Sequence, residues 1–213
     1  MPVIRHKTEN TEVRESMHRI IFATGNEGKM KEIRMILKDL DCQVLSMKEA
    51  GIEVDIVEDG TTFEENAIIK AKAIMELSGD IVLADDSGLE VDAMDKAPGV
   101  YSARFMGEDT SYDIKNNYIR DQVKGLPMEK RSARFVCVIA CAFPDGRIFT
   151  TKGTFEGFIG DKIAGENGFG YDPIFWVPEF NCTSAELPPE VKNEVSHRGK
   201  ALSGMKEKLK EML

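Results

Sequence analysis

The sequence predicts an α/β protein whose β-sheet is mixed rather than all-parallel. Three observations carry this prediction. Short apolar segments of strand length alternate with amphipathic helical segments in the first half of the chain, a hairpin-like pair of strands lies in the middle, and an amphipathic helix ends the sequence. Alternating strands and helices favour parallel pairing, whereas a hairpin imposes antiparallel pairing, so both should occur in one sheet.

The first half of the chain begins with a strand, a Gly-rich turn and a helix. The strand is expected at 19–23 and the turn at 24–29, where the sequence reads TGNEGK. The helix is predicted by apolar residues that share one face, which are Met30, Ile33, Ile36 and Leu37. A second helix should begin after Thr62, because Thr62 and Glu65 have the spacing of a capping box, and it should end at Gly79.

The next elements are a strand and a helix separated by a loop. The strand is predicted at 81–84, and the adjacent acids Asp85 and Asp86 are typical of a turn that ends it, since Asp, Ser and Gly are common turn residues. A helix is expected from Thr110 to Gly125. Its inward face should carry Ile114, Tyr118, Ile119 and Val123.

The last third of the chain predicts a hairpin, a loop and a closing helix. A strand at 134–143, rich in Val, Ile and Phe, precedes a Pro-Asp-Gly turn at 144–146 and a returning strand. A Gly-rich loop at 165–177 follows. The closing helix should begin at Ser196, and its predicted inward residues are Ala201, Leu202, Met205, Leu209 and Met212.

The composition excludes several classes of protein. With 42% hydrophobic and 31% charged residues, the 213-residue chain suits a globular protein with its own core. The net charge of −9 argues against long nucleic acid as a partner, while a small polyanion would need local positive charge, a helix N-terminus or a metal. Four cysteines are too few for a disulfide scaffold, which favours a reducing cytoplasm, and the absence of a CxxC pair argues against a structural zinc site. No apolar run reaches the roughly 18 to 20 residues of a membrane span, so no membrane partner is expected.

The turn at 24–29 is a candidate anion site. A Gly-containing loop between a buried strand and a helix presents free N–H groups, the helix dipole adds partial positive charge, and Lys29 adds a full charge. The same residues also suit a plain strand-to-helix connection with a solvated lysine. The GxxxxGK[ST] pattern of a P-loop is absent.

Three acids are candidate ligands for Mg²⁺, which takes few protein carboxylates and completes its octahedron with water or phosphate oxygens. They are Glu58, Asp85 and Asp86. Adjacent residues of an extended chain point to opposite sides, so Asp85 and Asp86 should not share one role. Taken alone, Glu58 is better interpreted as a solvated surface acid.

The late part of the chain contains residues suited to a planar, polar ligand. The loop at 169–172, Phe-Gly-Tyr-Asp, can stack a base on an aromatic ring, although each ring taken singly is better interpreted as a core residue. Lys192, His197 and Arg198 add three cations or donors near a helix start. Such a group is either solvated or holds phosphates and a carbonyl-bearing base.

Taken together and in order, these motifs resemble the inosine triphosphate pyrophosphatase family, whose members hydrolyse non-standard purine nucleoside triphosphates such as ITP, dITP and XTP. The resemblance spans nearly all of the chain after residue 19. It rests on ATGNEGKMKEI (23–33), TTFEENAIIKAKA (61–73), LADDSGLEVDAMDKAPGVYSARF (83–105), GFGYDPIF (168–175) and SHRGKAL (196–202).

The resemblance implies an elongated α/β fold of two lobes around a long mixed β-sheet flanked by helices, with the active-site cleft between the lobes. Residues 19–213 would form this single domain, and the polar residues 1–18 an extension. A homodimer is implied as well. Members of the family use Mg²⁺ to cleave between the α and β phosphates of a purine nucleoside triphosphate, which yields a nucleoside monophosphate and pyrophosphate.

The resemblance also assigns roles to individual residues. Asp86 would be the general base and, with Glu58, a metal ligand, while Asp85 and Glu65 are further candidates to bind metal or position water. The expected substrate-binding residues are Thr24, Gly25, Asn26, Glu27, Gly28, Lys29, Lys70, Ser87, Phe169, Gly170, Tyr171, Asp172, Lys192, His197 and Arg198. Those from Thr24 to Lys29, with Lys70, would hold the triphosphate, and those from Phe169 onward the base.

Base selectivity is expected to come from hydrogen-bond donors. Hypoxanthine and xanthine carry an oxo acceptor where adenine carries an amino donor, so donors at that position would reject adenine. Two other interpretations stay open: a nucleotide pyrophosphatase with another base preference, and a nucleotide-binding module without turnover. The intact set of Lys29, Glu58, Asp85 and Asp86 argues against the second of these.

Overall fold

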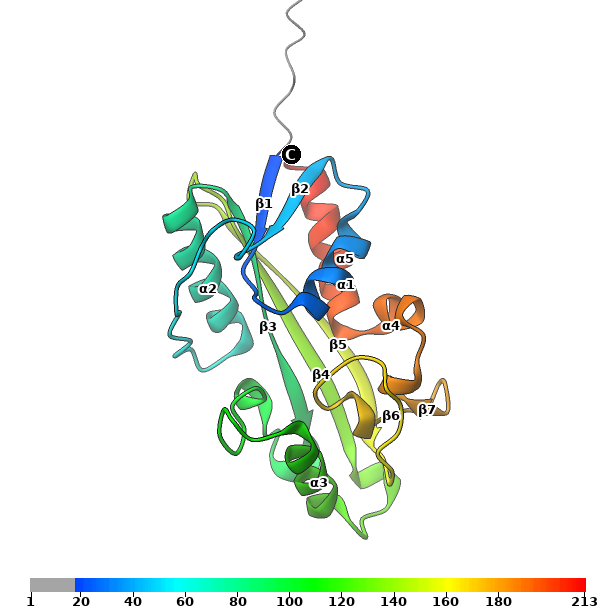
Figure 1. The fold of residues 1–213 in the computed structure, drawn as a ribbon. Helices are drawn as coiled ribbons and strands as arrows, with labels where there is room; N and C mark the ends of the chain where they lie inside the picture. Colours follow the sequence, from blue (N-terminus) through cyan, green and yellow to red (C-terminus); the bar gives the residue numbers. More distant parts are fainter. Residues whose placement is uncertain (1–17) are drawn as a thin grey trace, which may run out of the picture.

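A single seven-stranded sheet runs through the protein (Figure 1), with strand order β2-β1-β3-β4-β5-β6-β7. The structure, a computed structural model, describes residues 18–213. The strands are β1 (His18–Phe22), β2 (Cys42–Ser46), β3 (Ile81–Val91), β4 (Ser132–Ala142), β5 (Ile148–Ile159), β6 (Phe175–Val177) and β7 (Cys182–Thr183). The helices are α1 (Glu27–Leu37), α2 (Phe63–Ser78), α3 (Tyr112–Val123), α4 (Pro189–Val195) and α5 (His197–Lys210). The predicted extension at 1–18 lies outside the described residues except for His18, which begins β1.

The sheet is mixed, as the sequence predicts. β1 pairs in parallel with both β2 and β3, whereas β3, β4, β5, β6 and β7 pair antiparallel in succession. The turn between β4 and β5 closes with a hydrogen bond from the Phe143 N–H to the Arg147 carbonyl, 3.0 Å long. Gly146 in this turn has a φ of 90°, which only glycine adopts readily.

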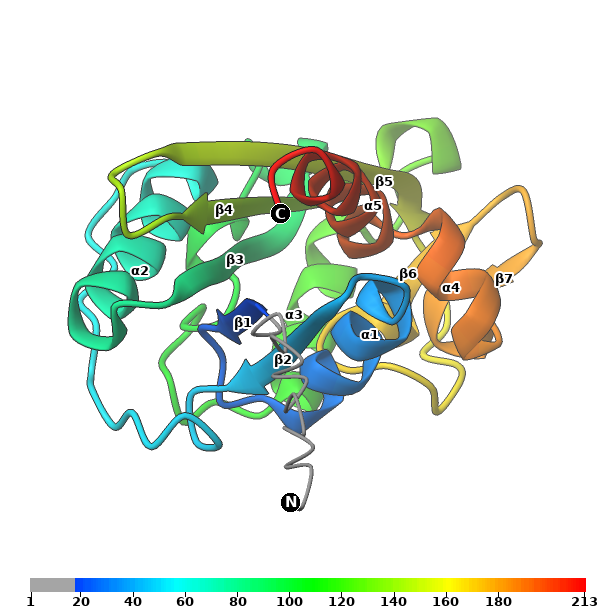
Figure 2. The ribbon, with the colours of Figure 1, turned by 90° about the horizontal axis from the view of Figure 1, so that it is seen from above.

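Helices cover both faces of the sheet (Figures 1 and 2). Because side chains alternate along a strand, Ile21 and Ala84 face α2, while Phe22 and Leu83 face α1 and α5. These two cores form the first lobe, and a third core joins α3 to the far ends of β4, β5 and β6 in the second lobe. Within residues 18–213, no helix combines the length and apolar character that a membrane span requires.

The helix termini confirm several predictions. Thr62 caps α2: its side chain accepts from the Glu65 N–H, and the Glu65 carboxylate returns to the Thr62 N–H, which completes the capping box. Gly79 ends the helix in the left-handed conformation, with a φ of 69°. Ser196 caps α5 by accepting a hydrogen bond from the Gly199 N–H. These local signals act within one turn of helix and need no tertiary contacts.

The prediction for α3 was partly wrong. The helix begins at Tyr112 after the N-cap Ser111, not at Thr110, and two predicted inward residues, Ile114 and Tyr118, are 55% and 40% exposed. Its buried face consists of Lys115, Asn116, Ile119 and Val123. The two polar residues of that face donate hydrogen bonds to distant loops: the Lys115 ammonium bonds to the Ala103 carbonyl and the Asn116 amide to the Gly170 carbonyl.

The interpretation of the acid pair as the end of a strand was also wrong. β3 continues to Val91 and pairs with β4 from Val82 to Val91. β1, however, pairs with β3 only as far as Leu83, so between Ala84 and Leu89 one edge of β3 has no neighbouring strand among residues 18–213. Side chains satisfy the free backbone groups there: the Lys70 ammonium bonds to the Asp85 carbonyl at 3.1 Å. Similarly, the Leu89 N–H bonds to the Ser102 hydroxyl at 2.8 Å.

Candidate active site

The two acids of β3 stand at its unpaired edge, and each points to a different face of the sheet. Asp85, only 1% exposed, shares the face of Leu83 and Ser87, toward α1 and α5. Asp86 points toward α2. The expected divergence of adjacent side chains is therefore present even though the predicted turn is not.

Asp85 organises two cations. The Lys29 ammonium bonds to both carboxylate oxygens, at 2.9 and 3.1 Å, and the Arg198 Nε lies 3.6 Å from Oδ2. Burial alone would raise the pKa of Asp85, but the charges of Lys29, Arg198 and Lys70 outweigh it and hold the pKa well below its usual range. Asp85 is therefore a permanent anion that fixes Lys29 and Arg198 in place.

Asp86 has a different environment. The Asn66 amide donates to its Oδ2 at 3.1 Å, and the nearest cation, Lys70, is paired with Glu58 at 2.9 Å. Burial raises the pKa of Asp86 to about 6; the Asn66 hydrogen bond and Lys70 oppose this shift, and the charges of Glu58 and Asp85 add to it. Glu58 and Asp86 thus form a pair of acids that repel one another with one lysine nearby.

Asn66 was not among the residues predicted from the sequence. Its side chain is 1% exposed, and its Oδ1 accepts from the Gly60 N–H at 2.9 Å while its amide holds Asp86. It therefore ties the segment that carries Glu58 to the acid on β3. A sequence signal existed, because Asn66 and Lys70 are four residues apart and share one face of the predicted helix.

The start of α1 presents a free set of backbone donors. Asn26 is the N-cap, and its Oδ1 accepts from the Lys29 N–H at 3.0 Å, while the Thr24 hydroxyl accepts from the Asn26 N–H at 3.1 Å. The N–H groups of Glu27 and Gly28 have no acceptor within residues 18–213. A Cβ added at Gly25 would meet no atom within 4 Å, so the space beside this residue is open. These open donors and Lys29 suit an anion.

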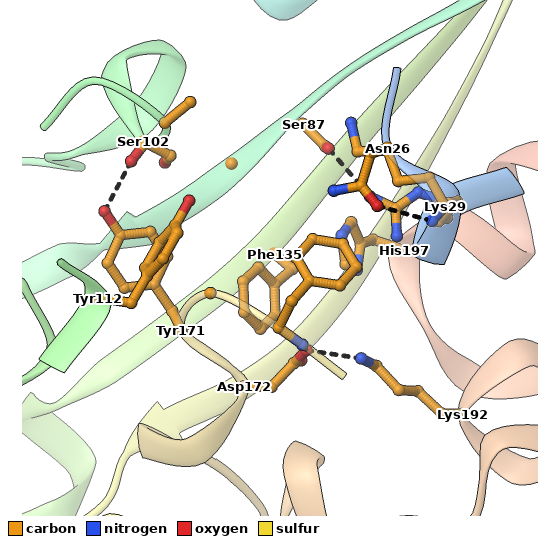
Figure 3. Close-up of a pocket in the computed structure, with 15 residues that line it drawn as sticks. Asn26, Lys29, Ser87, Ser102, Tyr112, Phe135, Tyr171, Asp172, Lys192 and His197 are labelled. Atoms are coloured by element: carbon orange, nitrogen blue, oxygen red, sulfur yellow. Dashed lines mark hydrogen bonds and ion pairs between the residues drawn. The ribbon is translucent and has the colours of Figure 1, made fainter. Parts of the chain in front are cut away.

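A pocket of about 350 Å³ extends from this helix terminus to the Gly-rich loop (Figure 3). Its lining includes Asn26, Lys29 and Ser87 at one end and Phe169, Lys192 and His197 at the other. Ser102 and Tyr112 of the second lobe, and Phe135 of β4, also line it, and none of these three was predicted from the sequence. Thus both lobes contribute to the pocket.

The loop at 169–172 is held by its own acid. The Asp172 Oδ2 accepts from the Phe169 N–H at 2.9 Å and from the Lys192 ammonium at 2.6 Å. Gly168 makes this approach possible, because a Cβ there would lie 2.4 Å from Lys192 Nζ. Tyr171 is buried and bonds to the Ser102 carbonyl, whereas Phe169 is 38% exposed at the pocket.

Lys192 and Arg198 both lie over the Phe169 ring, with the Lys192 Nζ 5.6 Å and the Arg198 Cζ 5.3 Å from its centroid. Arg198 also bonds to Glu32 at 2.9 Å and, more weakly, to the Ser87 hydroxyl at 3.4 Å. The guanidinium thereby links the ring-binding end of the pocket to the end near Asp85.

His197 is a neutral imidazole in the pocket wall. Its ring stacks on Phe135 with centroids 4.8 Å apart and an interplanar angle of 14°. Burial lowers the pKa of His197 well below its usual value, and the charges of Arg198 and Lys192 lower it further. Its buried Nδ1 has no partner in the described part of the chain. An unpartnered ring nitrogen at the pocket is a site for ligand hydrogen bonding.

Not every candidate residue lines this pocket. Asp86, Glu58 and Lys70 lie on the α2 side of β3, and the Glu65 carboxylate is engaged in the cap of α2, where it bonds to Thr61 and Thr62. Across residues 18–213, no cluster of three or more His, Cys, Asp or Glu side chains has the geometry of a metal site.

Fold and pocket together define an α/β protein with a cleft for a phosphorylated ligand that carries a planar ring. Helix N-terminal donors and Lys29 are at one end, and an aromatic ring with polar donors is at the other. The chain belongs to the Ham1 family, whose model matches residues 20–208. This match confirms the family relationship that the motifs indicate.

Individual relatives agree over most of the chain. A protein named dITP/XTP pyrophosphatase from Desulforamulus reducens is 52% identical over 184 residues, which cover 86% of this chain and 92% of that protein. One of the same name from Clostridium perfringens is 44% identical over 203 residues, covering 92% and 100%. A HAM1 protein structure from Coxiella burnetii superposes with a TM-score of 0.84 at 40% identity, covering 92% and 100%. The Staphylococcus aureus Ham1 protein gives a TM-score of 0.82 at 40% identity with the same coverage. The predicted fold class is confirmed.

Proposed function

We propose that the protein hydrolyses non-standard purine nucleoside triphosphates such as ITP, dITP and XTP to the nucleoside monophosphate and pyrophosphate. The observation that carries the proposal is one continuous pocket that joins a helix N-terminus with Lys29 to a loop that can stack a planar ring. The relatives named dITP/XTP pyrophosphatase support the same substrate class.

The triphosphate would lie at the start of α1. The free N–H groups of Glu27 and Gly28 and the Lys29 ammonium are donors to phosphate oxygens. Asp85 holds Lys29 in position before the ligand arrives, so little side-chain ordering is required on binding. On the α2 side, Lys70 is held by Glu58 and by the Asp85 carbonyl and would face the same phosphates.

Glu58 and Asp86 suit a magnesium ion. The negative charge of Glu58 adds to the raised pKa of Asp86, and a divalent cation between the two carboxylates would relieve this repulsion. Mg²⁺ commonly takes one or two protein carboxylates and completes its shell with water and substrate phosphates. When bound there, the ion supplies positive charge to the phosphate oxygens and polarises water.

Asp86 would orient the attacking water and accept its proton. The Asn66 amide and the Ser87 N–H bond to its two oxygens, at 3.1 and 3.0 Å, and fix the carboxylate plane. Asn66 is itself anchored to Gly60. A base held in this way keeps its geometry through the reaction, which general-base catalysis requires.

The base would bind at the far end, against Phe169. The Lys192 ammonium uses one donor on Asp172 and retains others, and the neutral His197 offers one ring donor. An oxo group at purine position 6 would accept from these donors. The amino group of adenine would leave them unpaired, which can cost several kcal/mol.

The decisive experiment compares ITP, dITP and XTP with ATP, GTP and a pyrimidine triphosphate in the presence of Mg²⁺. We expect stoichiometric pyrophosphate and a kcat/KM for the oxo purines well above that for ATP. Release of orthophosphate, or turnover without preference for the oxo purines, would refute the proposal. A preference for another base or binding without turnover would identify the alternative functions, and Asp86→Asn should lose rate far more than affinity.

We also propose that the enzyme acts as a homodimer in the cytoplasm. Four free cysteines support a reducing compartment; they are Cys42, Cys137, Cys141 and Cys182. Exposed apolar side chains before and on α3 support a self-association surface, and they include Tyr101, Met106, Ile114 and Tyr118. Light scattering after gel filtration measures the mass of the assembly, and a monomer at micromolar concentration would contradict the dimer.

A further inference from the structure

The cations of the site are already neutralised by carboxylates. Each has an acid within 2.9 Å, and the pairs are Lys29 with Asp85, Lys70 with Glu58, Lys192 with Asp172, and Arg198 with Glu32. Asp86 adds one more carboxylate, which has no ion-pair partner within residues 18–213. These groups together offer no net positive charge to a triphosphate, which carries several negative charges.

Arg104 is the exception. Its Nη2 donates to the Glu58 carbonyl at 3.4 Å, and its Cζ lies 5.0 Å from the centroid of the Tyr101 ring. No carboxylate in the described part of the chain lies within ion-pair distance of its guanidinium. A 3.4 Å contact is long for an N–H···O hydrogen bond, so the guanidinium is held only weakly.

The loop around Arg104 is firmly anchored. The Ser102 hydroxyl accepts from the Leu89 N–H of β3, and the Ser102 carbonyl accepts from the Tyr171 hydroxyl at 2.7 Å. The adjacent Ala103 carbonyl accepts from Lys115 at 2.7 Å. The backbone is therefore fixed immediately before Arg104, while the guanidinium itself has weak contacts. This combination suits a side chain that exchanges one partner for another.

Arg104 also joins the two lobes at the catalytic edge. It comes from the loop before α3 in the second lobe, whereas Glu58 belongs to the segment before α2 in the first lobe, and the two segments lie close together in Figure 1. The Glu58 carboxylate holds Lys70 while its carbonyl accepts from Arg104. Arg104 is therefore bonded to the backbone of the residue whose carboxylate holds Lys70.

We propose that Arg104 is an additional phosphate-binding residue of the enzyme. On substrate binding its guanidinium leaves the Glu58 carbonyl and donates to phosphate oxygens, where it supplies positive charge that no carboxylate cancels. Charge-assisted bonds from arginine to phosphate are shorter and stronger than a bond to a neutral carbonyl, so the exchange is favourable. This inference rests on the proposed triphosphate substrate.

The test uses Arg104→Gln, which keeps a donor for the Glu58 carbonyl but removes the charge, together with Arg104→Lys. Binding of inorganic tripolyphosphate is measured by calorimetry without nucleotide turnover, alongside kcat and KM for dITP. Arg147→Ala is the matched control, because Arg147 also lies over an aromatic ring, Phe143 at 4.7 Å, but is paired with Asp145.

We expect Arg104→Gln to weaken tripolyphosphate binding roughly 10- to 100-fold. Arg104→Lys should recover part of the loss, because it restores the charge without the forked donors. For Arg104→Gln, the unfolding midpoint and the affinity for Mn²⁺, a stand-in for Mg²⁺ measured without tripolyphosphate, should stay unchanged. The same measurements on Arg147→Ala should all match the wild type. Equal tripolyphosphate binding by Arg104→Gln and the wild type would overturn the inference, as would a loss of Mn²⁺ affinity that accounts for the whole effect. Because the wild-type turnover of dITP is measured in the same series, failure of the proposed function is recognised separately.

Discussion

At the scale of single residues, two neighbouring acids on one strand have opposite relations to stability. Asp85 and Asp86 differ by one position in sequence and by the face of the sheet that they occupy. Asp85 meets two cations, whereas Asp86 meets an amide and a second acid. Burial is common to both, so the difference in their pKa shifts comes from the partners.

Replacement of Asp85 by Asn should destabilise the protein. Lys29 would lose its ion-pair partner and Arg198 would keep only Glu32, which costs on the order of 3 kcal/mol in this buried site. Since the folded-state pKa is lowered, the wild-type advantage is present above the unfolded pKa of about 3.9 and is lost as the pH falls below it. Urea unfolding at pH 7 and at pH 3 measures the difference in free energy of unfolding between the wild type and Asp85→Asn. A variant as stable as the wild type at pH 7 would contradict the stabilising role given to Asp85.

Replacement of Asp86 by Asn should stabilise the protein when a chelator is present. The folded-state pKa of about 6 means that the ionised carboxylate costs stability above that pH, on the order of 2 kcal/mol for a shift of about two pKa units. The cost is absent below about pH 4, where the carboxyl is protonated in both states. We expect Asp86→Asn to unfold at higher urea than the wild type at pH 8 and at equal urea at pH 4. A variant that is less stable than the wild type at pH 8 would show that the ionised Asp86 carboxylate does not destabilise the fold.

At the scale of elements, the placement of α5 on the sheet sets the position of His197 and Arg198. The helix starts directly over β5, where a Cβ on Gly153 would lie 2.2 Å from the His197 carbonyl oxygen and 2.8 Å from the Ala201 nitrogen. Both are backbone atoms of the helix. They cannot move without moving the side chains that line the pocket.

Gly153→Ala should therefore push α5 away from β5, lower the free energy of unfolding by about 1 to 3 kcal/mol and raise the KM for the substrate. Gly204→Ala is the matched control in the same helix, because its nearest contact would be an ordinary 3.5 Å to Thr151. That change should stabilise the helix by up to about 1 kcal/mol and leave KM unchanged. Denaturant unfolding and steady-state kinetics measure both variants. A Gly153→Ala enzyme with wild-type KM would contradict the role given to this contact.

The elements that the sequence predicts well are those with local signals. The caps at Thr62, Gly79 and Ser196 and the turn at 144–146 each depend on residues within one turn of chain, and all are present. Four elements went unpredicted, namely β2, β6, β7 and α4. They are two to seven residues long, and the strands among them are defined by pairing with distant partners.

The residues of the candidate site also fall into a predicted and an unpredicted group. Charged residues within family motifs were named from the sequence, and the pocket brings Asn26, Lys29, Lys192 and His197 together. Residues that act through contacts across the fold were missed, and these are Asn66, Ser102, Arg104, Tyr112 and Phe135. An asparagine or a serine carries no visible role in sequence until the backbone group or the acid that it contacts is known.

At the scale of the whole molecule, the pocket couples the two lobes because both contribute to its wall. A hydrolysis-resistant dITP analogue with Mg²⁺ should therefore stabilise the protein as a unit. At one hundred times the dissociation constant, the expected gain in free energy of unfolding is about 2.7 kcal/mol. The corresponding ATP analogue at the same concentration should give a much smaller gain.

Hydrogen exchange locates this stabilisation. Slower amide exchange is expected at the start of α1 in the first lobe and in the loops at 99–107 and 165–172, which line or flank the pocket from the other side. Protection confined to one lobe would mean that the ligand does not bridge them. The comparison needs only the intact protein and the two analogues.

The unpaired edge of β3 has a consequence for behaviour at high concentration. An open strand edge is a template on which another chain can add a strand, and this is a common route to aggregation. Here the Lys70 ammonium, the Asp86 carboxylate and the Ser102 hydroxyl already occupy backbone groups that an incoming strand would need. The side chains that prepare this edge for catalysis therefore also keep it from templating intermolecular sheets.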